Sequence, residues 1–123
     1  MKSFITLHET KTNELICLNI NEIVCFICVD KRTRIYIKGD ENETAISVNE
    51  KASVILKKIG DYRKFVLVHT KSANNELAIA VDLIKVVAHS SANDTTLVVL
   101  TDDSFADLEV NESVTSIAEM LNN

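Results

Sequence analysis

The chain has 123 residues, of which 46% are hydrophobic and 25% charged, a balance that excludes a disordered or collagen-like chain. It contains no proline, no tryptophan and two glycines. No apolar run approaches the roughly 18 residues of a membrane-spanning helix. The first residues, 1–4, lead directly into an alternating pattern that lacks the features of a signal peptide. We therefore expect a cytoplasmic protein, or one assembled into a particle after cytoplasmic synthesis.

The net charge of −5 is unevenly distributed along the chain. Residues 1–60 carry nine Lys/Arg and eight Asp/Glu, a net charge of +1. Residues 61–123 carry four and ten, a net charge of −6. Because an acidic surface repels phosphate backbones, nucleic-acid binding is disfavoured and would need a local basic patch.

The sequence repeats itself at an offset of 61 or 62 residues. The matching residues include Phe4 with Phe65, His8 with His69, and Val48-Asn49-Glu50 with Val110-Asn111-Glu112. Matched residues in the same order indicate two copies of one unit, at 1–60 and 61–123. A unit of about 60 residues is marginal as an independent fold, so we expect the two copies to share one core.

Each copy is predicted to contain five strands followed by one helix. β-branched and apolar residues predict strands near 4–8, 15–20, 23–29, 34–38 and 44–48, and again near 65–69, 76–81, 84–89, 95–100 and 105–110. The apolar spacing then becomes helical, at Ala52, Ile55, Leu56 and Ile59 and at Val114, Ile117, Ala118 and Leu121. Asn49 and Asn111 are the expected helix caps.

These elements predict an α+β protein. We expect two fused repeats of five strands and a helix to form a β-rich pseudo-dimer with an approximate twofold axis. Its strands would form a small barrel or sandwich, with two short helices packed on it.

The cysteines and histidines give no metal site. Cys25 and Cys28 lie three apart in a predicted strand, so their side chains point to opposite faces and cannot grip one ion. We expect reduced, buried thiols. His8 and His69 could bridge a metal as a symmetric pair, but no third ligand stands at a suitable spacing. Nucleophile, phosphate-loop and zinc-protease motifs are also missing, so we expect neither an enzyme nor a cofactor, and no small-molecule substrate is evident.

A basic hairpin at 31–38 is the most distinctive polar feature. Its candidate partner-binding residues are Lys31, Arg32, Arg34, Tyr36 and Lys38, with Tyr36 offering a ring for stacking. The corresponding places in the second copy hold no cation. Three roles remain open for the hairpin: protection of a sheet edge, docking on an acidic protein surface and nucleic-acid binding. The acidic second copy would complement the hairpin of another chain, which implies self-association.

Several short segments resemble a known family. Phe4-Ile5-Thr6-Leu7, Asn21-Glu22-Ile23 and Val110-Asn111-Glu112-Ser113-Val114 resemble the small FlbD-type proteins of bacterial flagellar gene clusters. That resemblance covers each copy almost end to end. It implies five strands and a helix per copy, an accessory role in a macromolecular machine and no catalytic residues.

Two further resemblances imply nucleic-acid binding. The element order is similar to that of the carbon storage regulator family of RNA-binding proteins. The whole chain resembles a LytTR DNA-binding domain, and residues 65–72 carry that likeness. The first family places an arginine after its last strand, where this chain has Asn49-Glu50 and Asn111-Glu112. LytTR domains carry basic residues where this chain has Leu67 and Thr70.

Two functions follow as expectations. The first is a non-enzymatic structural or interaction module that docks on, or builds into, a larger protein assembly, as a flagellar-type accessory or a phage structural or accessory protein. The second is a nucleic-acid-binding regulator of LytTR-like or carbon-storage-regulator-like type that uses the hairpin 31–38.

Overall fold

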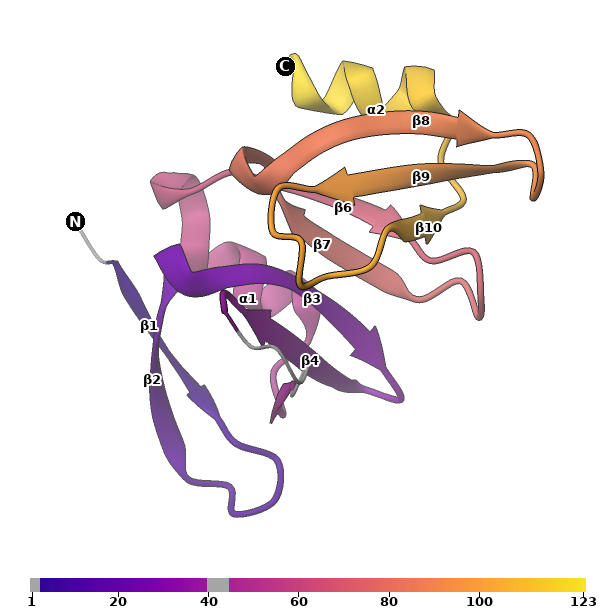
Figure 1. Cartoon of the computed structure of the whole chain (residues 1–123). Helices are drawn as coiled ribbons and strands as arrows, with labels where there is room; N and C mark the ends of the chain where they lie inside the picture. Colours follow the sequence, from indigo (N-terminus) through magenta and orange to yellow (C-terminus); the bar gives the residue numbers. More distant parts are fainter. Residues whose placement is uncertain (1–2, 40–44) are drawn as a thin grey trace.

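A computed structural model describes residues 3–39 and 45–123 (Figure 1). The elements of the first half are β1 (Phe4–His8), β2 (Leu15–Asn19), β3 (Ile23–Val29), β4 (Arg32–Ile37), β5 (Ile46–Val48) and α1 (Ala52–Ile59). Those of the second half are β6 (Phe65–His69), β7 (Glu76–Ala80), β8 (Ile84–Ser90), β9 (Thr95–Leu100), β10 (Leu108–Val110) and α2 (Val114–Leu121). The two halves thus present the same elements in the same order, as the sequence predicts.

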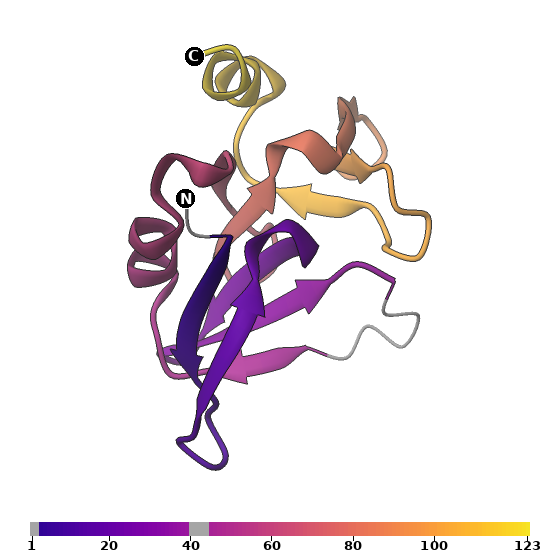
Figure 2. The same cartoon turned by 90° about the vertical axis from the view of Figure 1, so that its left-hand side faces the viewer.

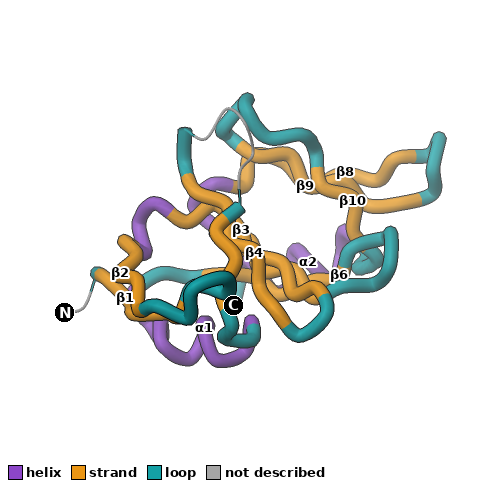
Figure 3. Tube along the Cα trace, turned by 90° about the horizontal axis from the view of Figure 1, so that it is seen from below, coloured by secondary structure: helices purple, strands orange, loops and turns teal. Residues whose placement is uncertain are grey.

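The protein is a β-rich α+β structure built from three antiparallel sheets and two short helices, counted over the described residues. A five-stranded sheet in the order β5-β4-β3-β7-β6 lies between the two-stranded sheet β1-β2 and the three-stranded sheet β10-β9-β8. Figure 3 shows the two smaller sheets at opposite ends of the molecule. The expected small barrel does not form, because each of these sheets is open.

Among the described residues, the two halves join at one strand pairing. β3 pairs with β7 through Cys25 opposite Ile79, Phe26 opposite Ala78 and Ile27 opposite Leu77. A twofold axis would also require β2 to pair with β8. Within the described residues β2 pairs with β1 and β8 with β9. The halves are therefore joined head to tail, and the expected pseudo-twofold arrangement is not observed.

Two apolar cores result from this junction. The first contains Phe26 together with Ala78 of the second half and is covered by α1. The second contains Val24 and Cys25 of the first half and is bordered by α2. Figure 2 shows the two helices on separate parts of the molecule. Because the consecutive residues Cys25 and Phe26 of β3 point to opposite faces, this one strand contributes to both cores.

Arg63 adds a polar anchor at the same junction. Its Nη1 donates to the carbonyl oxygens of Ile20 and Ile23, each at 2.7 Å, while Nη2 donates to Asp82 Oδ1 at 2.9 Å. The guanidinium carbon lies 5.3 Å from the centroid of the Phe65 ring. The arginine side chain is 8% exposed. A residue that begins the second half therefore satisfies backbone acceptors of the first.

The cysteines and helix caps correct two details of the sequence prediction. Cys25 and Cys28 do lie on opposite faces of β3, at the second and the first core respectively, but Cys17 is exposed rather than buried. The asparagines expected as caps lie too early in the chain. Ser113 caps α2 through its side chain, and the capping position of α1 is Lys51.

Candidate nucleic-acid interface

The hairpin of β3 and β4 presents the predicted basic residues on a tight turn. Asp30 and Lys31 form the two-residue connection, with φ angles of 50° and 69° in the left-handed region. Two successive left-handed residues match the right-handed twist of the flanking strands. The turn therefore holds the hairpin tip in a compact form, with Lys31 exposed on it.

β4 separates its charged face from its buried face by strict alternation. Arg32 and Arg34 are exposed, whereas Thr33 and Ile35 are fully buried. The Thr33 hydroxyl donates to the backbone carbonyl of Glu50 at 2.6 Å. The buried side thus fixes the strand, and the two guanidinium groups point to the opposite face, two residues apart.

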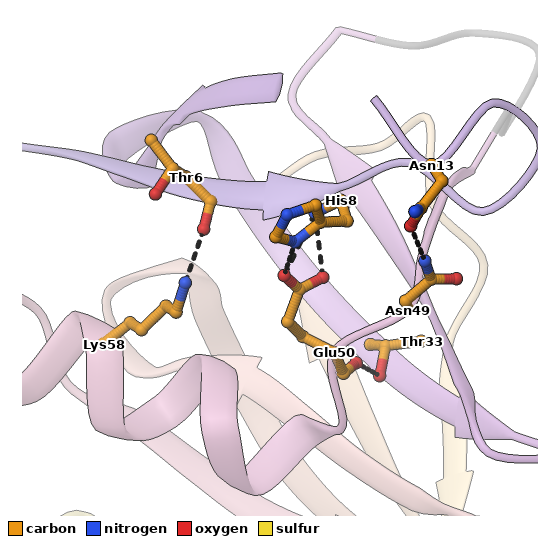
Figure 4. A network of polar contacts seen from close by, with 7 residues as sticks. All are labelled: Thr6, His8, Asn13, Thr33, Asn49, Glu50 and Lys58. Atoms are coloured by element: carbon orange, nitrogen blue, oxygen red, sulfur yellow. Dashed lines mark hydrogen bonds and ion pairs between the residues drawn. The ribbon is translucent and has the colours of Figure 1, made fainter. Parts of the chain in front are cut away.

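A polar network holds β1 and the start of α1 behind this strand (Figure 4). Glu50 Oε1 accepts from the His8 backbone N–H at 2.9 Å, and its Oε2 lies 2.8 Å from His8 Nδ1. Lys58 Nζ donates to the Thr6 carbonyl at 2.7 Å. These contacts join β1 to α1 and to Glu50, which precedes α1. They lie on the buried side of β4 and leave its charged face open.

The second half repeats this carboxylate–imidazole pair. Glu112 accepts from the His69 N–H at 2.9 Å, and its other oxygen lies 2.7 Å from His69 Nδ1. Each histidine is therefore held by a glutamate of its own half. Among the described residues, no group of three or more His, Cys, Asp or Glu is placed to hold a metal ion.

Both glutamates give a prediction for acid stability. Burial raises the pKa of Glu50 and of Glu112, but hydrogen bonds from His8 and His69 outweigh it, and each pKa lies below its ordinary value. The stabilisation is therefore present above the unfolded pKa of about 4.3 and is lost as pH falls through the lower folded pKa. We expect the urea midpoint to fall with pH below about 4.3, and less steeply in Glu50→Gln/Glu112→Gln. An unchanged acid slope in that variant would contradict this account.

The structure brings together only part of the predicted hairpin site. Lys31, Arg32 and Arg34 cluster at the tip. Lys38 follows the other end of β4, four residues from Arg34, which is roughly 13 Å along a strand. Tyr36 is half-buried, and its ring meets Phe105 edge-on at 6.2 Å between centroids. The tyrosine thus packs against the loop before β10.

An apolar pocket lies beside the charged face of β4. It has a volume of about 190 Å³, and Tyr36, Ile27, Leu77 and Phe105 are among its lining residues. Ile27 is also the cross-strand neighbour of Arg34. The guanidinium of Arg34 therefore projects from a strand whose neighbouring surface is apolar and uncharged.

Sequence reasoning missed Lys11 as a neighbour of the hairpin. The N–H of Thr10 donates to the Ser47 carbonyl at 2.9 Å, and the two hydroxyls lie 3.1 Å apart. Ser47 is in turn the register partner of Arg34. The exposed Lys11 follows Thr10, so it joins this edge of the basic surface. No local signal reveals the contact, because the two segments are 37 residues apart.

The cations of the hairpin tip remain available to a partner. The ion pairs found in the described part of the chain are His8–Glu50, Arg63–Asp82, His69–Glu112 and His89–Asp94. None of them uses Lys31, Arg32 or Arg34. The corresponding hairpin of the second half carries the His89–Asp94 pair instead.

Comparison with known proteins identifies a shared fold. Neither a protein-family model nor a curated protein sequence matches the chain. A solved structure does match: the LytTR DNA-binding domain of a methyl-accepting/DNA response regulator from Bacillus cereus. The TM-score is 0.62 at 17% sequence identity, and the match covers 100% of this chain and 99% of that one. Separately, no helix in the described residues is long and apolar enough to span a membrane.

This likeness corrects the main functional expectation. The structural or docking module of a larger assembly, whether flagellar accessory or phage protein, is wrong, because the fold shared over the whole chain is that of a DNA-binding domain. The LytTR resemblance of the whole chain is supported at the level of the fold, whereas the FlbD-type resemblance is not.

Proposed function

We propose that the chain is a DNA-binding domain that contacts duplex DNA through the tip of the β3–β4 hairpin. The observation that carries the proposal is the likeness to a LytTR DNA-binding domain over the full length of the chain. Lys31, Arg32 and Arg34 supply the contacts, as exposed cations on one hairpin.

The shape of the hairpin suits a groove. The major groove of B-DNA admits a two-stranded β-ribbon, and arginine is the residue that most often reads guanine there through two hydrogen bonds. Arg32 and Arg34 lie on the same face of β4 and project from the exposed side of the ribbon. Lys31 at the turn is placed to meet a phosphate, which positions the protein without reading sequence.

The charge balance sets how this binding depends on salt. With a net charge of −5, the domain has no broad positive field and relies on a few local contacts. Each neutralised phosphate contributes a slope of about −0.9 to log K against log salt. Three cations at the tip therefore give a slope of about −3, shallower than that of strongly basic DNA-binding proteins.

The test is a binding titration with a labelled duplex. We expect fluorescence anisotropy with a mixed-sequence DNA duplex to show binding at low salt, weakening with this slope as salt is added. A duplex RNA of the same sequence is the comparison arm, because its deep, narrow major groove excludes side chains. The absence of DNA binding at low salt would refute the proposal, as would equal binding to RNA.

A further inference from the structure

We propose that this chain self-associates head to tail, with the β8 edge of one copy pairing with the β2 edge of the next. The inference goes beyond DNA binding and does not depend on it. It rests on the contact that the two halves of the chain already make with each other.

The β3–β7 junction is the template for this contact. β8 occupies in the second half the place that β3 has in the first, and β2 occupies the place of β7. Both β3 and β8 carry a register irregularity after their first residue, Ile23 and Ile84 respectively. Within the described residues the partner edge is filled at β3 and β7 and open at β8 and β2.

The template also sets the register between copies. Cys25–Ile79, Phe26–Ala78 and Ile27–Leu77 are the pairs within the chain. Shifted by 61 residues, they place Val86 opposite Leu18, Val87 opposite Cys17 and Ala88 opposite Ile16 of the next copy. All six of these residues are uncharged, so the three pairs themselves bury no charge.

Exposed apolar side chains gather at these two ends. Phe4, Leu15 and Val86 are exposed by 50%, 62% and 46%. Together with Val54 they are the exposed large hydrophobic residues of the described chain. Phe65 is the counterpart of Phe4 in the second half, and it already makes the corresponding contact within the chain.

Phe65 is half-buried, and its ring lies 5.5 Å from that of Phe26 in the first half. The same docking between copies would place Phe4 of one chain against Val87 of another. The transfer of this apolar side chain out of water favours the association.

The geometry predicts an open series of chains. The two edges differ, so a copy that uses its β8 edge keeps its β2 edge available for a further copy, as in a head-to-tail series. Lys85 lies at the irregular position of β8, outside the three pairs, where a charge limits how readily further strands add. Reversible, concentration-dependent association is the expected behaviour.

Disulfide trapping tests the register. Val87→Cys places a thiol opposite Cys17 of the next copy, within the distance that a disulfide spans between paired strands. Mild oxidation with diamide should produce a ladder of dimers, trimers and higher species. Cys17→Ser in the same background should abolish the ladder, and Ala88→Cys should give none, since its side chain faces away from Cys17. A Val87→Cys protein that stays monomeric on oxidation would overturn the proposed register.

Sedimentation without DNA tests the association itself. We expect the average mass of the wild type to rise with concentration above the 13.7 kDa of one chain. Val86→Lys adds a charge at the pairing edge and should leave a monomer, whereas Val54→Lys, an equal change on the exposed side of α1, should behave as the wild type. A wild type that remains monomeric, or a dimer insensitive to Val86→Lys, would refute the proposal.

Discussion

Arg32→Glu/Arg34→Glu is expected to weaken duplex DNA binding by at least about 100-fold at low salt. Hydrogen bonds to charged groups contribute about 1.5–3 kcal/mol each, and reversing the charge adds repulsion from the phosphates. The slope of log K against log salt should become shallower by about 2, because two phosphate contacts are lost. Anisotropy titrations at several salt concentrations measure both quantities.

A matched variant separates a local site from a general effect of charge. Lys51→Glu/Lys57→Glu changes the net charge by the same amount in the α1 region, which packs against the opposite, buried face of β4. We expect this variant to bind DNA nearly as the wild type does. Equal losses in the two double variants would show that binding follows net charge, and would contradict the hairpin site. Both variants should unfold at the wild-type urea midpoint, since all four side chains are exposed.

Arg63→Met is expected to lower the free energy of unfolding by about 2–4 kcal/mol. Methionine retains much of the apolar stem but removes the donors to the Ile20 and Ile23 carbonyl oxygens. Acceptors at this junction then lose their charged partner, and leaving a buried acceptor unsatisfied costs about 1–3 kcal/mol. Urea denaturation followed by circular dichroism measures the change, with Arg34→Met as the exposed control, expected within about 0.5 kcal/mol of the wild type.

The same experiment tests the domain organisation. We propose that residues 1–60 and 61–123 unfold as one cooperative unit, because Ala78 lies in the first core and Cys25 in the second. Arg63→Met should therefore shift a single transition without splitting it. Two separate transitions, with only one of them displaced, would show that the halves fold independently.

Local sequence patterns predicted the elements but not the relation between the halves. The strands and both helical stripes follow from short-range spacing, which a repeated pattern makes easier to recognise. The pairing of β3 with β7 joins residues about 50 positions apart. Two copies of one unit can be related by a twofold axis or joined head to tail, and both arrangements are compatible with the same local sequence pattern. The choice depends on which strand edges meet, and this is a property of the assembled structure.

The candidate site was predictable to the extent that it lies on one strand. The predicted strand begins at Arg34, whereas the observed β4 begins at Arg32, and alternation along it places both arginines on a common face. Tyr36 lies on this face as well, but its ring packs on Phe105, a residue from the other half. Lys11 reaches the same surface through the contact of Thr10 with Ser47. The Tyr36–Phe105 contact and the position of Lys11 both depend on packing between residues far apart in the sequence. The spacing of residues along the chain does not predict such contacts.

The most direct measurement of the proposed function is a two-dimensional amide NMR titration of the ¹⁵N-labelled protein with duplex DNA. The account predicts that the largest shifts fall on residues 30–35, with smaller changes near Lys11, and that they disappear when salt is raised. Shifts that instead cluster on the second-half hairpin at 90–95, or no shifts at low salt, would contradict DNA binding through the β3–β4 hairpin.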